Sequence, residues 1–146
     1  ALLDCPEANT VAAAVRTFEE LLAEDQPDLG IANSGQMVML HGHCHQKAFD
    51  LVKPMQKVLG ELAGLKVEPI ESSCCGMAGD FGYGADTYDV SMKMANANLL
   101  PVIRNAPPDA LIAADGTSCR CQIKDGTGRE AVHVAVLLDQ LMSQKL

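Results

Sequence analysis

Short apolar runs alternate along the chain with longer stretches in which apolar residues recur at helical spacing. The runs predict strands at 37–40, 66–70, 110–114 and 131–134. Between and around them, the spacing of apolar residues predicts helices at 9–24, 46–62, 86–105 and 135–145. This alternation predicts an α/β fold: an open, mainly parallel four-stranded sheet with helices on both faces, Rossmann-like in layout.

Prolines and glycines indicate where these helices end or bend. Pro27 and Gly30 end the first helix, so residues 26–35 are expected to form a loop. Pro54 should kink or restart the second helix, and Pro101 should break the third. The residues at helical spacing are Val11, Val15, Phe18 and Leu22 in the first helix, and Phe49, Val52, Met55, Leu59 and Leu62, on one face, in the second. We divide the chain into an N-terminal helix and linker, 1–35, and a single cysteine-rich domain, 36–146.

The composition suits a protein with a packed core and an acidic surface. Hydrophobic residues make up 48% of the 146 residues, enough for a core at this size. The net charge of -8 argues against nucleic acid or an anionic membrane surface as a partner. We find no apolar run of transmembrane length and no secretory signal, so a cytoplasmic location is expected. Because the sequence opens on Ala1 rather than Met, we expect a piece excised from a longer protein.

Four of the six cysteines follow predicted strands. Cys44 comes after the first strand, Cys74 and Cys75 after the second, and Cys119 after the third. His133 lies at the fourth. Ligands of parallel sheets sit outside the carboxyl ends of the strands, so these groups are expected at one edge of the sheet.

Four converging thiolates select soft metals, and the sequence leaves two kinds of centre open. Sets of four cysteines hold iron–sulfur clusters and structural zinc alike. Zinc favours paired C-x2-C knuckles, whereas the adjacent Cys74 and Cys75 can reach different irons of a broader cluster, which favours the cluster modestly. Gly76 and Gly79 let the loop wrap closely and offer backbone N–H groups to sulfur.

The remaining histidines and cysteines have less certain roles. We expect His41, His45 or His133 to donate a hydrogen bond to sulfur rather than to ligate. Cys121 is expected to be a bystander, because in an extended segment it would point away from Cys119. A thiol enzyme is a third reading, with Cys74 or Cys75 as the nucleophile beside His41 or His45.

Three stretches together resemble the cysteine-rich CCG domain. They are His41-Gly-His-Cys-His-Gln-Lys-Ala48, Cys74-Cys-Gly-Met-Ala-Gly-Asp-Phe-Gly-Tyr83 and Gly116-Thr-Ser-Cys-Arg-Cys-Gln-Ile123. The family includes one subunit of heterodisulfide reductase and the iron–sulfur subunits of glycolate oxidase and anaerobic glycerol-3-phosphate dehydrogenase. The chain looks most like the C-terminal domain of fused FAD-binding and iron–sulfur oxidoreductases, similar to D-lactate or D-2-hydroxyglutarate dehydrogenases. The resemblance covers roughly residues 37–142.

The resemblance implies that Cys44, Cys74, Cys75 and Cys119 hold the metal. Many members carry C-x-x-C where this chain has Gly116 and Cys119, so four ligands and an ordinary [4Fe–4S] cluster are implied rather than a five-cysteine noncubane cluster. Some halves of the family resemble zinc sites, which keeps zinc as the alternative. Members usually have two such halves, and this chain has one.

The function expected from this resemblance is electron transfer within a larger oxidoreductase. FAD in the missing part of the parent would oxidise a 2-hydroxy acid, and electrons would leave through iron–sulfur centres toward a quinone or another acceptor. The partners implied are the flavin and other iron–sulfur domains, and the parent could lie peripheral to the inner membrane. The isolated domain is not expected to be catalytic by itself.

Overall fold

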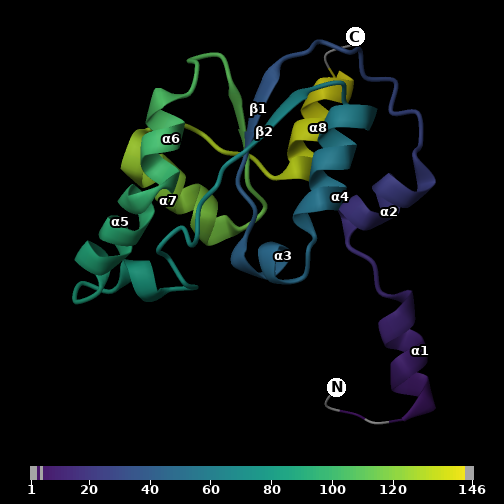
Figure 1. Cartoon of the computed structure of the whole chain (residues 1–146), viewed down its shortest axis with the longest axis horizontal. Coiled ribbons are helices and arrows are strands. Elements are labelled where there is room, and N and C mark those ends of the chain that lie inside the picture. Colours follow the sequence, from purple (N-terminus) through teal and green to yellow (C-terminus); the bar gives the residue numbers. More distant parts are fainter. Residues whose placement is uncertain (1–2, 4, 144–146) are drawn as a thin grey trace.

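Three short parallel strands form the centre of the molecule. The computed structural model, which describes Leu3 and residues 5–143, orders them β2 (Lys66–Pro69), β1 (Met37–Leu40) and β3 (Leu111–Ala113) (Figure 1). Met39 of β1 lies in register with Glu68 on one side and Ile112 on the other. The expected open parallel sheet is confirmed.

The expectation of a fourth strand at 131–134 is wrong. This segment makes one isolated parallel bridge, in which Val132 N–H donates to Ile112 O at 3.0 Å and Ala114 N–H donates to Val132 O at 2.9 Å. The helix α8 begins at Val134, so the chain leaves the extended conformation before a ladder can form.

Helices cover both faces of the sheet, as predicted. On β1, Val38 and Leu40 pack into one core cluster and Met39 into the other, because successive side chains of a strand point to opposite faces. The first cluster includes residues of α4 (Val52–Lys57), η1 (Val58–Leu62) and α8 (Val134–Ser143). The second includes residues of α5 (Tyr88–Ala97), α6 (Leu99–Asn105) and α7 (Thr117–Thr127) (Figure 1).

The single helix expected at 9–24 is two helices. α1 (Pro6–Ala14) ends before Val15, and α2 (Phe18–Asp25) begins after Thr17. Thr17 and Glu20 form a capping box: the Thr17 hydroxyl accepts from Glu20 N–H, and the Glu20 carboxylate accepts from Thr17 N–H. This reciprocal cap starts a new helix. None of the residues of α1 is buried, and Val11 and Val15 are exposed. Residues 26–35 form no helix or strand, as predicted.

The helix expected at 46–62 is also divided. α3 (Cys44–Ala48) is followed by a break at Asp50, which has the left-handed φ of 60°. The chain restarts as α4 with Pro54 in its first turn, where a missing N–H costs no intrahelical bond, so the predicted restart is confirmed. Phe49, which was expected on the same helix face as Met55 and Leu59, is 73% exposed, whereas those two residues are buried.

Two further helix boundaries differ from the expectation. The break between α5 and α6 falls at Asn98 rather than at Pro101, because Pro101 occupies the first turn of α6. The helix α7 was not expected at all. α8 confirms the last predicted helix through Ser143, and positions 144–145 lie outside the described residues. Within the described part, every helix is too short or too polar to cross a membrane.

Candidate metal centre

The four expected cysteines come from three strand ends. Cys44 opens α3 after β1, Cys74 and Cys75 lie in the loop after β2, and Cys119 lies in the first turn of α7 after β3. A cavity of about 270 Å³ lies at this edge, lined by His43, Cys44, His45, Cys74, Cys75, Ala78, Gly79 and Ser118. The predicted convergence at the carboxyl edge therefore appears as three cysteines on one cavity, with Cys119 directly behind.

Cys75 and Cys119 form the buried floor of this site. Their Sγ atoms are 3.4 Å apart, and both side chains are buried. The Cys119 thiol donates to the Cys75 sulfur, which lowers the pKa of Cys75, and the nearby His41 imidazole lowers it further. The same hydrogen bond and burial raise the pKa of Cys119. One thiolate is thus favoured at the floor before any metal binds, and thiolate is the ligand form of cysteine.

His41 completes a compact three-residue group with these two cysteines. It follows β1, is 1% exposed, and its Nδ1 lies 3.1 Å from Ser72 Oγ. Among the described residues, none gives Nε2 a hydrogen-bond partner. Ligand atoms of His41, Cys75 and Cys119 all lie within 4.8 Å of one another. His41 therefore lies close enough to the sulfurs to share a metal ion with them or to support them through a hydrogen bond.

Cys44 and Cys74 lie on the more accessible side. Cys44 is exposed and Cys74 half-buried. Partial burial, followed by interaction with Cys74 and Cys75, raises the pKa of Cys44. Gly76 N–H donates to Cys74 Sγ at 3.3 Å, the kind of backbone-to-sulfur bond expected of the glycine loop.

The glycine loop has the positive backbone angles that its sequence suggests. Gly76 has φ +91°, and a Cβ there would lie 2.2 Å from the Ser91 carbonyl oxygen. Gly79 has φ +75° with open space around it and lines the cavity. Ala78 between them also has a positive φ, 43°. Only glycine fits at Gly76, so the wrap of the loop depends on that residue.

Lys47 is a supporting residue that the sequence analysis missed. Its Nζ donates to Ser72 Oγ at 3.1 Å, to the Ser72 carbonyl, and to the Ser73 carbonyl at 3.4 Å. It thereby ties α3 to the segment that leads into Cys74. The signal in the sequence was its place three residues after Cys44, on the same face of a helix.

The other predicted site residues lie in three different places. His45 lines the cavity beside His43, with ring centroids 5.3 Å apart. Cys121 lines another cavity, of about 340 Å³, with Tyr83 and Lys124. His133 pairs with Asp115, 3.5 Å away, rather than with the four cysteines as expected from a fourth strand.

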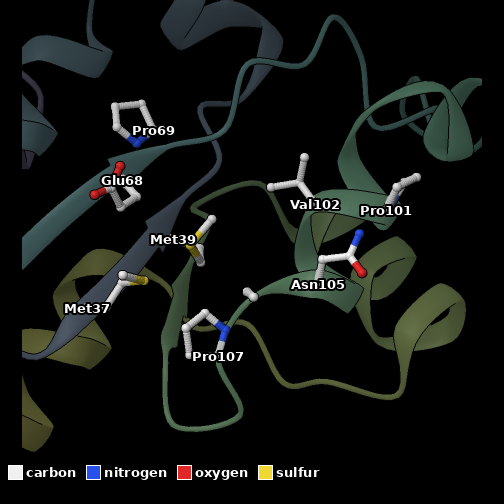
Figure 2. A pocket seen from close by; sticks show the side chains of 9 residues that line it. Met37, Met39, Glu68, Pro69, Pro101, Val102, Asn105 and Pro107 are labelled. Carbon is white, nitrogen blue, oxygen red and sulfur yellow. The ribbon is translucent and has the colours of Figure 1, made fainter.

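A larger groove lies elsewhere on the molecule. It measures about 470 Å³ and lies between the sheet and α6, with Met37, Met39, Val102 and Pro107 at its wall (Figure 2). Its described lining includes neither thiol nor imidazole, so the candidate metal ligands lie at the cysteine-lined cavity and not at this groove.

The residues present fit a soft metal centre. Three cysteines from two strand ends line one cavity, Cys119 from a third lies against Cys75, and a buried imidazole nitrogen beside them has no partner among the described residues. Thiolate and imidazole suit zinc, and thiolates suit iron–sulfur clusters. Both centres that the sequence left open are compatible with this donor set.

Comparison with known proteins relates the chain to parts of dehydrogenases. It is 28% identical over 106 residues to a subunit of the anaerobic glycerol-3-phosphate dehydrogenase of Escherichia coli (strain K12), covering 73% of this chain and 26% of that subunit. It is 31% identical over 108 residues to D-2-hydroxyglutarate dehydrogenase of the same strain, and 29% identical over 110 residues to that of Pantoea ananatis (strain AJ13355). These matches cover 72% and 75% of this chain but only 10% and 11% of the relatives.

The chain thus spans about a quarter or a tenth of the length of these relatives. No family model matches the chain, and no solved structure matches it. The expected similarity to these two kinds of dehydrogenase is confirmed, and the chain is similar to a segment of larger oxidoreductase proteins.

Proposed function

We propose that this chain binds an iron–sulfur cluster, of the [4Fe–4S] type, and transfers electrons within a larger oxidoreductase. The observation that carries the proposal is the convergence of four cysteines. Cys44, Cys74 and Cys75 line one cavity, and Cys119 Sγ lies 3.4 Å from Cys75 Sγ. When bound, such a cluster supplies reversible one-electron transfer, and ligation by four cysteines is common to this class.

The chain's own residues would divide the work of holding the cluster. Cys75 and Cys119 would bind it from the buried side, where a thiolate is already favoured. Cys44 and Cys74 would bind it from the accessible side. Gly76 N–H would hold the Cys74 sulfur in place. This asymmetry leaves one side of the site near the surface, where a redox partner could approach.

The relatives suggest the setting in which such transfer would occur. One is a subunit of a glycerol-3-phosphate dehydrogenase, and the others are D-2-hydroxyglutarate dehydrogenases. By analogy, the parent protein would use FAD in another domain to oxidise a 2-hydroxy acid. Electrons would then pass through this domain toward a quinone or another acceptor. The domain alone would not catalyse the oxidation.

Gly116 supports a count of four cysteine ligands. A Cβ at this position would lie 2.9 Å from Cys119 Sγ, so Gly116 directly adjoins the site. A cysteine here could act as a fifth ligand, as the family pattern with C-x-x-C suggests. Glycine in its place supports an ordinary four-cysteine cluster.

A zinc site is the second candidate, favoured by the position of His41. Ligand atoms of His41, Cys75 and Cys119 lie within 4.8 Å of one another, a span that one small ion can bridge. Cys74 or Cys44 would supply the fourth ligand of a tetrahedral site. The domain would then be a structural interaction module without redox activity.

Anaerobic reconstitution tests the two candidates. The full chain would be incubated with ferrous iron and sulfide, reduced with dithionite, and examined by EPR. The proposal predicts a paramagnetic signal that is lost in Cys44→Ala and retained in Cys121→Ala, the matched control on a different cavity. A signal that survives Cys44→Ala but is lost in His41→Ala would contradict the four-cysteine assignment.

A further inference from the structure

A second group of potential ligands lies outside the cysteine site. It contains Glu19 from the first turn of α2, Asp115 after β3, and His133 before α8. One ligand atom from each residue lies within 4.8 Å of the others. Three segments that are far apart in sequence therefore place two carboxylates and an imidazole together.

Glu19 is the member that the protein alone leaves unsatisfied. It is 5% exposed, and its Oε1 atom is buried with no hydrogen-bond partner among the described residues. Burial, and then the charge of Asp115, raise the pKa of Glu19. A buried carboxylate without a partner is costly, so this position calls for a positive charge or a proton.

The hydrogen bonds of Asp115 and His133 do not involve Glu19. Asp115 Oδ1 accepts from Val134 N–H at 3.0 Å, and Oδ2 accepts from the Gln46 amide at 2.6 Å. His133 Nδ1 lies 3.5 Å from Asp115 Oδ1 and accepts from Ala135 N–H at 3.1 Å. These bonds hold Asp115 and His133 in place, and none of them supplies a donor to Glu19 Oε1.

We propose that Glu19, Asp115 and His133 bind a divalent cation of the Mn²⁺, Fe²⁺ or Zn²⁺ class. Carboxylate oxygens and an imidazole nitrogen form a mixed donor set that suits these ions. One divalent cation neutralises both carboxylates, of which Glu19 is buried and Asp115 partly buried, whereas one shared proton neutralises only one of them. Water would complete the coordination, as it does in sites with three protein ligands.

Such an ion would link α2 to the segments that follow β3 and precede α8. Glu19 belongs to α2, while Asp115 and His133 flank the point where β3 and the isolated bridge end. The site shares no ligand with the four cysteines, and Gln46 connects the two: its amide nitrogen donates to Asp115, and its amide oxygen accepts from His43 N–H. The proposal therefore stands whether the cysteines hold iron or zinc.

Mn²⁺ binding to the full chain, with its thiols kept reduced, tests the site. Mn²⁺ prefers carboxylate and imidazole ligands to thiolates, so the cysteine site should not compete for it. The EPR signal of free Mn²⁺ reports how much ion remains unbound during a titration. We expect saturable binding of one ion, weakened about tenfold or more in Glu19→Gln and in Asp115→Asn.

Glu24→Gln is the matched control, because Glu24 lies on the same helix but is exposed and paired with Arg16. It should bind Mn²⁺ as the wild type does. Thermal unfolding supplies a second measurement: Mn²⁺ should raise the Tm of the wild type and of Glu24→Gln, but not that of Glu19→Gln. Equal binding by the wild type and Glu19→Gln, or no saturable binding by the wild type, would overturn the proposal and leave a shared proton between the two carboxyls.

Discussion

Cys75 Sγ and Cys119 Sγ lie 3.4 Å apart, although the two cysteines are 44 positions apart in the sequence. One comes from the loop after β2 and the other from the first turn of α7, so only the folded sheet brings them together. Both are buried, and the hydrogen bond between them lowers the pKa of Cys75. The fold itself thus brings the two buried cysteines of the site together.

Gly116 should be needed for the metal centre rather than for the fold. Its φ is -65°, which any residue adopts, but a Cβ would lie 2.7 Å from His43 Cδ2 and 2.9 Å from Cys119 Sγ. We expect Gly116→Ala to change the free energy of unfolding by about 1 kcal/mol or less, while the reconstituted centre decays faster in air. Visible absorption measures the decay. Gly60→Ala is the control, because the nearest atom to its Cβ would be 3.8 Å away; equal decay in both variants would contradict the assignment.

Gly76 should be needed for the fold as well as for the metal centre. A Cβ would lie 2.2 Å from the Ser91 carbonyl oxygen, in addition to the strain of φ +91°. Gly79 shares the positive φ but has open space, so Gly79→Ala should cost only the strain, about 1 to 2 kcal/mol. Gly76→Ala should cost clearly more, about 3 kcal/mol or more. Urea unfolding under anaerobic, reducing conditions measures both, and similar costs would show that the loop can shift away from Ser91.

Gln122 and Ser91 share a buried hydrogen bond, so their contributions to stability should be coupled. Gln122 Nε2 donates to Ser91 Oγ at 2.9 Å and joins α7 to α5 beneath the glycine loop. Gln122→Leu should destabilise the protein by about 1 to 3 kcal/mol, because the Ser91 hydroxyl loses its partner. In a double-mutant cycle with Ser91→Ala, the coupling should be about 1 kcal/mol. Additive effects would mean that the bond contributes nothing of its own.

Glu19 should make the stability of the metal-free protein depend on pH. Its folded pKa is raised above the ordinary value of 4.5 by burial and by Asp115. The folded state therefore holds the proton more tightly, so this contribution is complete below about pH 4.5 and is lost as pH rises through the folded pKa. As pH rises through that window, the free energy of unfolding of the wild type should fall relative to that of Glu19→Gln. Glu24→Gln should follow the wild type; a constant difference for Glu19→Gln would contradict the shift.

The sheet and the meeting of the cysteines could be predicted because they follow from simple patterns. Apolar runs located β1 in full and β2 to within a residue. The rule that ligands bind at the carboxyl ends of parallel strands then predicted that Cys44, Cys75 and Cys119 lie near one another. These features depend on the apolar pattern and chain direction, which a sequence displays directly.

The errors arose where tertiary contacts or small capping signals decide the structure. α7 has the polar sequence TSCRCQIKDGT, and its buried residues are Cys119, Gln122 and Ile123, so its apolar stripe was too weak to recognise. Thr17 and Glu20 carry a capping-box pattern that divides the N-terminal helix, a short signal that the apolar spacing of 9–24 conceals. The grouping of Glu19 with Asp115 and His133 depends on the packing of α2 against α4 and η1, which local spacing does not reveal.

The most direct measurement of the central claim is the metal and sulfide content of the chain purified without exposure to air. Iron and zinc by mass spectrometry, with acid-labile sulfide, would be determined per chain for the wild type and for Cys75→Ser. We predict about four irons and four sulfides with little zinc for the wild type, and loss of both iron and sulfide in Cys75→Ser. About one zinc per chain, without sulfide and without iron uptake on reconstitution, would contradict the electron-transfer account and assign the site to structural zinc.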